Sequence, residues 1–483
     1  MIRKNMKTAL KIFASFIKLI LLISIAICLW IFITPYFRID RNKEGDLFRN
    51  LPENCIDVIA LGSSHMQYAF NPAVFYEETG YYSYVLGSSC QPLSMSTNML
   101  QEALKTQKPT LVYVDVFTLL EQSDVCYADG MFYKAIDEMT GSNRLEAADK
   151  APEEVKLQYK YDLLMNHDQW KNIDLKNFKS FLDNAKQAEG YNYNLGHVPL
   201  EVLETRYVPL IAYEASEIKS LSDETKKSID DLIDLCNKEN IELIFIKTPY
   251  IIDEESTNTL NAVWNYVTSK GCKYIDFIQL ADEINWYIDM DGDTWHNNSW
   301  GAEIVTKYLA TYATENNLVK NHQYNAVYQD LLEDASLYTA KALMNRQNVD
   351  IYRLLDEASK YPCITIMNYK GYHRTSLQDY ESNALRNLGM TKDFKNNPNG
   401  NYYAVVQNGE LVQESEEPFT INLNGLNIQI EEDKVIVGDT EYNKTGEMQI
   451  IFADMNRSWT NDINIDYASK WFWKNGCDGF TCE

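Results

Sequence analysis

The sequence predicts an α/β protein whose doubly wound parallel sheet follows an apolar N-terminal helix and precedes a β-rich C-terminal region. Three observations predict this fold class. Short apolar runs alternate with helical stretches between residues 55 and 320. An uncharged apolar run covers residues 19–34. Strand-like runs separated by turn signals occupy residues 359–483.

The length and composition of the chain predict several domains. With 483 residues, of which 45% are hydrophobic, the chain can bury more than one core. We expect residues 1–37 to form a cytoplasmic basic segment and a transmembrane signal anchor, 38–320 an α/β domain with an insertion at 118–204, 321–358 a helical linker, and 359–483 a β-rich accessory domain.

The N-terminus combines basic side chains with an apolar run of membrane-spanning length. Ile12–Thr34 is long enough to cross a bilayer if Lys18 snorkels towards the headgroups. No small-residue cleavage site follows, which favours a retained signal anchor over a cleaved signal peptide. The clustered lysines disfavour a buried soluble helix. The basic cluster predicts a single-pass protein of the cell membrane with a cytoplasmic N-terminus and an extracellular bulk.

Charge and cysteine content exclude some classes of function. The 69 acidic and 44 basic residues give a formal net charge of −25, which argues against a nucleic-acid partner. The nine cysteines show no metal-binding spacing, and we expect neither a metal nor another cofactor. Cys477 and Cys482 could close a disulfide loop, and free thiols are equally compatible with the sequence.

Apolar runs between Cys55 and Lys320 predict the strands and helices of the α/β domain. The expected strands are Ile56–Leu61, Ser83–Leu86, Leu111–Phe117, Ile241–Ile246 and Tyr274–Phe277. The expected helices include Leu93–Lys105, Asp223–Asn240, Ser256–Ser269 and Glu303–Tyr312. In such a sheet the active crevice lies at the carboxyl ends of the strands.

The turn after the first expected strand, Gly62–His65, carries either a nucleophile or a helix cap. A serine at a helix N-terminus gains from the first-turn N–H groups and from the helix dipole. Serine is also a preferred N-cap residue, so this position alone favours the cap. A general base elsewhere in the chain would decide for the nucleophile.

A candidate base follows more than two hundred residues later. Asp293 and His296 form a D-x-x-H pattern before a helix, where a carboxylate can fix the tautomer of an imidazole that accepts a serine proton. The alternation of Asp289, Asp291 and Asp293 also resembles the start of a calcium loop. Thr294 and Trp300, however, occupy the positions where an EF-hand needs Gly and Glu.

These motifs together resemble the SGNH hydrolases of the GDSL superfamily over residues of roughly 55 to 318. The resemblance is to the membrane-anchored, extracytoplasmic branch, whose members include proteins that act on bacterial cell-surface polymers, and it implies a flavodoxin-like sheet. Gly62-Ser63-Ser64 matches the G-D-S block, which implies that Ser64 is the nucleophile. Asp293 and His296 match the D-x-x-H block. Val85–Pro92 resembles the second block, which implies that Gly87 and Ser64 donate to the oxyanion.

The chain departs from the family pattern at two places. Ser63 stands where the family has Asp, and no G-x-N-D block follows Leu111–Phe117. Loss of one oxyanion donor costs roughly 10²–10³ in rate, so a replacement is needed for full activity. The residues that could supply it are Gln91, Ser88 and Ser89, while Asp115 could accept a hydrogen bond behind the turn.

Three further residues could contribute to the pocket. His65 adjoins Ser64, but adjacent side chains on a turn diverge, so a place in the site wall is favoured over a role as base. Ser63 competes with Ser64 as nucleophile. His167 could line the pocket from the insertion, but a place on a surface helix is favoured for it. The insertion itself is either a lid, a substrate platform or structural filler.

The expected function is that of a serine esterase or O-acyltransferase with the triad Ser64, His296 and Asp293. Its expected substrates are acyl groups on a cell-surface glycan or a teichoic-acid-like polymer. The alternative is a weakly active or inactive scaffold that binds surface polysaccharide and supports an integral membrane acyltransferase, because the third-block Asn is missing.

The C-terminal region is predicted to be a β-rich, sandwich-like domain. It weakly resembles the interleukin-like EMT inducer domain, also called a stem domain, through Cys363–Gly371, a helix at Ser376–Leu388, Tyr403–Gly409 and Thr445–Asp454. This resemblance implies an accessory carbohydrate-binding role. A structural spacer is at least as well supported, and core packing equally explains Trp459, Trp471 and Trp473.

Overall fold

The structure is a computed structural model, which describes the following parts of the chain. These are residues 2–37, 44–119, 135–151, 153–161, 164, 171, 190–192, 194–199, 220–250, 253–280, 296–320, 322–344, 355, 358–359, 363–371, 379–453, 460–466, 471–474 and 480–481. Asp293, His167, Trp459, Cys477 and Cys482 lie outside the described residues.

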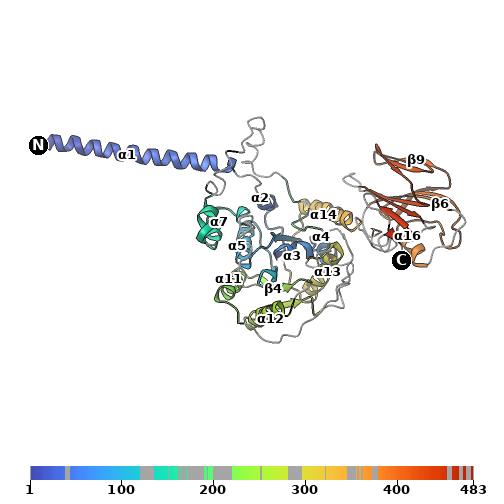
Figure 1. Ribbon diagram of the computed structural model, residues 1–483, viewed down its shortest axis with the longest axis horizontal. Helices are drawn as coiled ribbons and strands as arrows, with labels where there is room; N and C mark the ends of the chain where they lie inside the picture. Colours follow the sequence, from blue (N-terminus) through green and yellow to red (C-terminus); the bar gives the residue numbers. More distant parts are fainter. Residues whose placement is uncertain are drawn as a thin grey trace.

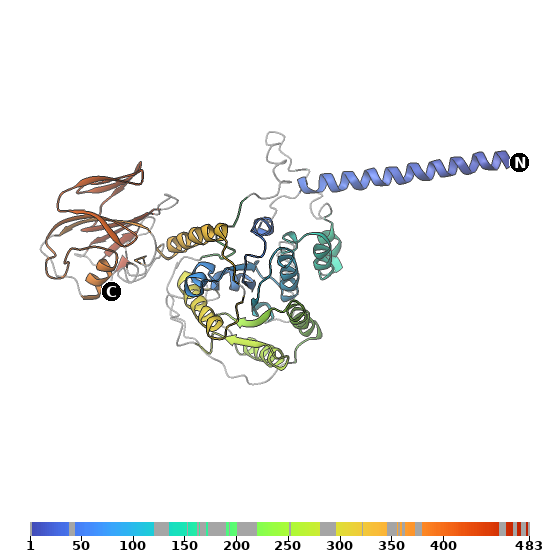
Figure 2. The same ribbon diagram turned by 180° about the vertical axis from the view of Figure 1, so that it is seen from behind.

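The N-terminal helix α1 (Ile2–Ile33) stands apart from the body of the protein (Figure 1, Figure 2). Its segment Lys11–Trp30 comprises 20 residues that are long and apolar enough to cross a membrane, and none of its length is buried by the rest of the chain. At 1.5 Å per residue this segment is about 30 Å long, which matches the hydrocarbon thickness of a bilayer. The predicted apolar helix is therefore confirmed as a candidate span.

A five-stranded parallel sheet forms the centre of the α/β region, as predicted. Its strand order is β2-β1-β3-β4-β5, so the chain reverses its direction of progress between β1 and β3. The strands are β1 (Val58–Gly62), β2 (Ser83–Gly87), β3 (Leu111–Asp115), β4 (Glu242–Lys247) and β5 (Lys273–Asp276). β1 and β3 are buried throughout, which explains their uninterrupted apolar sequences.

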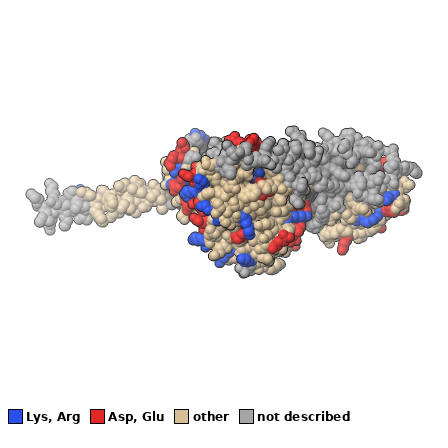
Figure 3. Space-filling view, turned by 90° about the horizontal axis from the view of Figure 1, so that it is seen from below, with Lys and Arg blue, Asp and Glu red and all other residues tan. Residues whose placement is uncertain are grey.

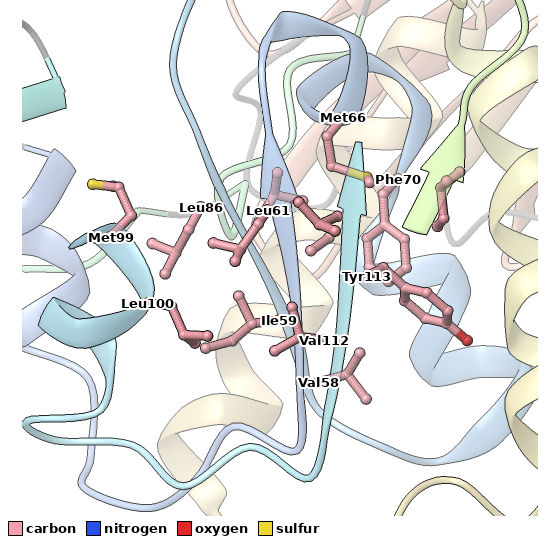
Figure 4. Close-up of a cluster of buried hydrophobic side chains, with 14 of the residues drawn as sticks. Val58, Ile59, Leu61, Met66, Phe70, Leu86, Met99, Leu100, Val112 and Tyr113 are labelled. Carbon is pink, nitrogen blue, oxygen red and sulfur yellow. The ribbon is translucent and has the colours of Figure 1, made fainter. Parts of the chain in front are cut away.

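Helices cover both faces of this sheet, as the doubly wound prediction requires. On one side α5 (Leu93–Ala103) packs against α11 (Asp223–Glu239). On the other, α13 (Ser299–Glu315) and α14 (Ala326–Met344) pack against α4 (Pro72–Thr79). Figure 4 shows the alternation: Leu86 and Leu61 lie towards Leu100, whereas Val58 lies on the side of Phe70 and Tyr113.

Some predicted boundaries differ from the observed ones. The strand expected at Leu111–Phe117 ends at Asp115, because Phe117–Leu119 turns into a 3-10 helix that stacks Phe117 on His65. The helix α12 begins at Glu254 rather than Ser256, where Asp253 caps it by accepting from the Ser256 N–H. Within the insertion, the described helices are α7 (Gly141–Asp149) and α8 (Glu153–Lys160).

The C-terminal region contains two antiparallel sheets, which confirms its predicted β-rich character. The seven-stranded sheet has the order β16-β15-β14-β13-β6-β7-β8, and the four-stranded sheet has the order β12-β11-β10-β9. The strands are β6 (Ile364–Gly371), β7 (Gly400–Gln407), β8 (Glu410–Ser415), β9 (Phe419–Leu423), β10 (Leu426–Ile430), β11 (Lys434–Val437), β12 (Thr440–Asn443), β13 (Met448–Ala453), β14 (Thr460–Asp466), β15 (Trp471–Lys474) and β16 (Phe480–Thr481).

Two apolar clusters hold this region together. One joins the two sheets face to face, with Ile366 and Val405 from the larger sheet and Ile428 and Val435 from the smaller. The other lies where α16 (Asp379–Asn387) packs on the larger sheet. Trp300 of α13 belongs to this second cluster and is only 4% exposed, so the C-terminal region contacts the helix that follows His296.

Candidate active site

The turn at the end of β1 requires glycine at its first position. A Cβ on Gly62 would lie 2.7 Å from Cβ of Asp115 on β3, and the residue has a φ of +153°. Both features exclude an ordinary side chain. The chain can therefore pass close to β3 and begin a new helix immediately.

That helix, α3 (Ser64–Ala69), has Ser63 as its N-cap and Ser64 as its first residue. The Ser63 Oγ accepts a hydrogen bond from the His65 N–H at 3.3 Å and donates one to Oδ2 of Asp115 at 3.0 Å. Ser63 is 1% exposed, so its hydroxyl is committed to the fold. The helix cap is thus Ser63 and the candidate nucleophile is Ser64, so the two interpretations of the turn apply to neighbouring serines.

Ser64 faces the histidine that the sequence singles out. Its Oγ lies 3.0 Å from Nε2 of His296, across 232 residues of sequence. This is hydrogen-bond distance for proton transfer between a nucleophile and its base. The pair lies at the carboxyl end of β1, next to the point between β1 and β3 where the strand order reverses.

The segment around His296 is held by the cap of α13. Asn298 is fully buried, and its Oδ1 accepts from the N–H groups of Trp300 and Gly301 at 2.9 and 3.0 Å. Asn298, two residues after His296, is thus the N-cap of α13, whose first residue is Ser299. Asp293, the predicted third member of the triad, lies outside the described residues, as does His167.

Asp115 is buried behind the turn, with 3% of its surface exposed. Burial raises the pKa of its carboxyl from 3.8 to about 7, although hydrogen bonds from Ser63 and nearby backbone oppose this shift. Oδ1 of Asp115 has no hydrogen-bond partner in the described part of the chain. The carboxyl therefore contacts the nucleophile turn through Ser63.

His65 forms part of the wall of the site. Its ring stacks on Phe117 with centroids 3.6 Å apart and meets Tyr250 edge to face at 4.8 Å. Burial, with a smaller effect of neighbouring His296, holds the pKa of His65 well below its usual range. The His65 ring is therefore neutral and packed between aromatic side chains. This environment supports its predicted place in the site wall rather than a role as the base for Ser64.

Gly87 lies beside the nucleophile turn because β1 and β2 pair Gly62 with Gly87. A Cβ on Gly87 would approach the Gly62 carbonyl oxygen to 2.9 Å, so this contact also depends on glycine. The carbonyl of Gly87 accepts a hydrogen bond from Nε2 of Gln67 on α3 at 2.9 Å. The end of β2 is thus tied to the helix that carries Ser64.

The three suggested replacements for the missing oxyanion asparagine have different environments. Gln91 is 1% exposed; its Oε1 accepts from Ser88 Oγ at 3.2 Å and its Nε2 donates to Ser96 Oγ at 3.0 Å. The side chains of Gln91 and Ser88 thus bond to each other, and Gln91 also bonds to Ser96 on α5. Ser89 is exposed at the surface.

Sequence reasoning missed two residues near the site, Tyr68 and His197. Tyr68 meets the His296 ring edge to face at a centroid distance of 4.7 Å. Its position one turn after Ser64 on α3 is the signal that could have found it. His197 is 3% exposed, and its Nδ1 lies 2.8 Å from the Gln67 carbonyl oxygen. No sequence motif marks His197, and its burial holds its pKa at about 4.

A cavity of about 240 Å³ adjoins this region. Gln67, Gly87 and His197 line it together with Glu44 of α2 (Glu44–Arg49) and Tyr84 of β2. Among the residues that the structure describes, no group of three or more His, Cys, Asp or Glu could hold a metal ion.

Comparison with known proteins gives structural likeness only. No family model matches the sequence, and no curated protein matches it. The structure is similar to an inferred acylhydrolase from Bacteroides fragilis, at 11% identity over 58% of this chain and 99% of that chain, with a TM-score of 0.31.

Two further solved structures are similar to this chain. One is an inferred lipolytic protein of the G-D-S-L family from Desulfitobacterium hafniense, at 12% identity over 53% of this chain and 98% of that chain, with a TM-score of 0.27. The other is a GDSL-like lipase from Bacteroides thetaiotaomicron, at 12% identity over 56% of this chain and 94% of that chain, with a TM-score of 0.28. Because these scores are low, the function proposed below rests on the geometry of the site.

Proposed function

We propose that this protein is a membrane-anchored, extracytoplasmic serine esterase or O-acyltransferase that acts on acyl groups of a cell-surface glycan or teichoic-acid-like polymer. One observation carries the proposal. Ser64 Oγ and His296 Nε2 lie 3.0 Å apart at the carboxyl end of a parallel sheet, on a helix N-terminus. This contact supports the roles proposed for the pair, with Ser64 as the nucleophile and His296 as its base.

In the first step His296 accepts the Ser64 proton at Nε2 while Ser64 Oγ forms a bond to the acyl carbon of the ester. Asp293 is assigned the role of holding the imidazole and stabilising its protonated form, on the strength of the D-x-x-H spacing. The edge-on contact of Tyr68 restricts the imidazole ring on another side. The proton then passes from His296 to the departing alcohol oxygen as the ester bond breaks.

The negative charge of the tetrahedral intermediate is assigned to the backbone N–H groups of Ser64 and Gly87. The pairing of Gly62 with Gly87 and the Gln67 bond to the Gly87 carbonyl support this assignment, because they hold β2 against the turn. In the second step His296 removes a proton from water or from a sugar hydroxyl, whose oxygen attacks the acyl carbon; the bond from that carbon to Ser64 Oγ then breaks, and His296 returns the proton to Ser64 Oγ. Water gives hydrolysis, and a sugar hydroxyl gives acyl transfer.

The site of action follows from α1. A single apolar span preceded by basic residues would keep the catalytic body tethered at the outer surface of the cell membrane. A tethered body can reach polymers that are themselves bound to the cell surface. The family resemblance of the sequence supplies the polymer class, and the acyl group is an ester-linked one because the proposed chemistry is that of a serine nucleophile.

The test is covalent labelling of the full chain by an alkyl fluorophosphonate, a probe that phosphonylates activated serines. We expect labelling of the wild type at Ser64, loss of labelling in Ser64→Ala and His296→Ala, and unchanged labelling in Ser269→Ala. Ser269 is an exposed serine at the end of α12 (Glu254–Ser269) and serves as the matched control. Turnover of a soluble acetyl ester should follow the same order.

Two results would overturn the proposal. Wild-type turnover by Ser64→Ala would exclude the assigned nucleophile. Absence of wild-type labelling, combined with retained binding of surface polysaccharide, would identify the scaffold that supports an integral membrane acyltransferase. The missing third-block Asn is the observation that favours this second function.

A further inference from the structure

Exposed apolar side chains gather at the end of α8 and just beyond it. Leu157, Tyr161 and Leu164 are 62%, 46% and 39% exposed. α8 ends at Lys160; the Tyr161 N–H donates to the Leu157 carbonyl oxygen, and the Leu164 N–H donates to the Tyr161 carbonyl oxygen. Each of these three residues thus lies within one turn of the next, and together they are here called the 157/161/164 face.

Three exposed large apolar side chains so close together occur nowhere else in the described residues after α1. Outside α1, the other exposed large apolar side chains among the described residues are Leu145, Tyr191, Val198, Tyr324, Val327 and Val412. Leu145 belongs to α7, which packs against α8. Contiguous apolar surface of this kind marks a contact with another apolar partner.

The end of the candidate membrane span touches this face. Trp30 is the last residue of the apolar segment Lys11–Trp30, and its ring meets that of Tyr161 edge to face, with centroids 6.4 Å apart. Figures 1 and 2 also place α7 beside the end of α1 nearest the body. Trp and Tyr are the residues that favour the boundary between hydrocarbon and headgroups. The contact therefore places Tyr161 at the depth of that boundary.

Short spacing keeps the neighbouring leucines within the same layer. Leu157 lies four residues before Tyr161, about 6 Å along α8, and the bond from the Leu164 N–H to the Tyr161 carbonyl oxygen keeps Leu164 within one turn of Tyr161. Interfacial helices bury their apolar faces by about 5–10 Å. Lys156 and Lys160 lie on the same helix, where they pair with Glu153 and Asp149. Basic and acidic groups are intermixed on the visible surface near α1 (Figure 3), so apolar contact rather than net charge would drive the binding.

We propose that the 157/161/164 face inserts into the outer leaflet of the bilayer as an interfacial contact, which holds the catalytic body against the membrane in addition to α1. This inference rests on the membrane anchoring of the proposed function and adds a second membrane contact to it. Two contacts fix the tilt of a body that α1 alone would leave free to swing.

The test places an environment-sensitive fluorescent amino acid at single positions of the full chain in lipid nanodiscs. The positions are Leu22 in α1, Leu157 in α8, and Val412, an apolar control that is 40% exposed on β8 of the C-terminal region. Nanodiscs of phosphatidylcholine and phosphatidylglycerol, with and without brominated acyl chains, report contact with hydrocarbon. Soluble acrylamide reports access to water.

We expect bromolipid quenching and a blue-shifted emission at positions 22 and 157, and neither at position 412. Quenching at 22 with a water-accessible, unquenched 157 would overturn the interfacial face and leave the anchor intact. A probe at 157 that is shielded from both quenchers would indicate a protein partner and would also overturn the lipid contact. Absence of quenching at 22 would overturn the anchor and, with it, the interfacial inference.

Discussion

Ser63 Oγ and Asp115 Oδ2 are joined by a 3.0 Å hydrogen bond that ties the turn after β1 to the end of β3. Both side chains are buried, at 1% and 3% exposure. The carboxyl group behind Ser64 therefore belongs to Asp115 at the end of β3, and the hydroxyl that bonds to it belongs to Ser63 in the turn after β1. This arrangement leads to the first two predictions.

The first prediction concerns the pH dependence of stability. Burial raises the pKa of Asp115 from 3.8 to about 7, so between these values the folded protein binds a proton that the unfolded chain has lost. The free energy of unfolding must then fall as pH rises through this window. The side chain of Asp115→Asn cannot titrate. As pH rises from 3.8 to about 7, the free energy of unfolding of the wild type should therefore fall by about 2–4 kcal/mol relative to that of this variant.

Urea unfolding of both proteins at a series of pH values measures this difference. The Asn variant keeps an oxygen to accept the Ser63 hydroxyl, so it is a matched control for the hydrogen bond. A constant difference between the two proteins across the window would show that the Asp115 carboxyl does not titrate there.

The second prediction exchanges the two partners. At a pH above the Asp115 pKa of about 7, Ser63→Asp places two ionised carboxyl groups at one hydrogen bond, where like charges oppose each other, and should cost about 1–3 kcal/mol of stability. Adding Asp115→Ser restores one hydroxyl and one carboxylate and should recover most of that loss. A double-mutant cycle on unfolding free energies should give a coupling of about 1–3 kcal/mol, and additive effects would contradict the pairing.

The third prediction concerns the cap of α13. Asn298→Ala removes the acceptor of the Trp300 and Gly301 N–H groups and should cost about 1 kcal/mol of stability. Ser222→Ala removes the comparable cap of α11, where Ser222 Oγ accepts from the Thr225 N–H at 3.0 Å. The two stability losses should be similar.

Only the Asn298 variant should lower kcat for a soluble ester, because His296 lies two residues before that cap. We expect a reduction of about tenfold or more, since small displacements of a catalytic group are costly. Equal kcat values for the two variants would show that the cap does not position His296.

The fourth prediction compares two glycines. Gly87→Ala forces a Cβ against the Gly62 carbonyl oxygen, so the end of β2 must shift away from the turn. Gly80→Ala meets open space, although its φ of +73° costs about 1 kcal/mol with a side chain. Both variants should lose stability, but only Gly87→Ala should lose kcat, by about 10²-fold if it removes one oxyanion donor. Unchanged kcat in Gly87→Ala would exclude Gly87 from that role.

The two central strands β1 and β3 of the parallel sheet were predictable because their burial is complete. Val58–Gly62 and Leu111–Asp115 are buried on both faces, so their sequences are continuous apolar runs that end in polar turns. The C-terminal strands were harder to predict. β8 and β12 carry mainly exposed or half-buried side chains, and polar sequences such as Thr440–Asn443 show no apolar signal.

The candidate site divides in the same way. Ser64 and His296 stand out in the sequence because short motifs surround them, and their assignment as a pair required only that a sheet bring strand ends together. Tyr68, His197 and the bond between Ser63 and Asp115 carry no such signal. They depend on which side chains the tertiary packing places in contact.

The sequence by itself therefore determined the apolar N-terminal span, the alternation of strands and helices and the residues that could serve as nucleophile and base, because each is written in local composition or spacing. Only the tertiary structure decided that Ser64 lies 3.0 Å from His296, that Asp115 supports the turn through Ser63, and that Trp30 meets Tyr161. Such contacts join segments far apart in the chain, and their distances follow from the packing of the whole fold rather than from any local pattern.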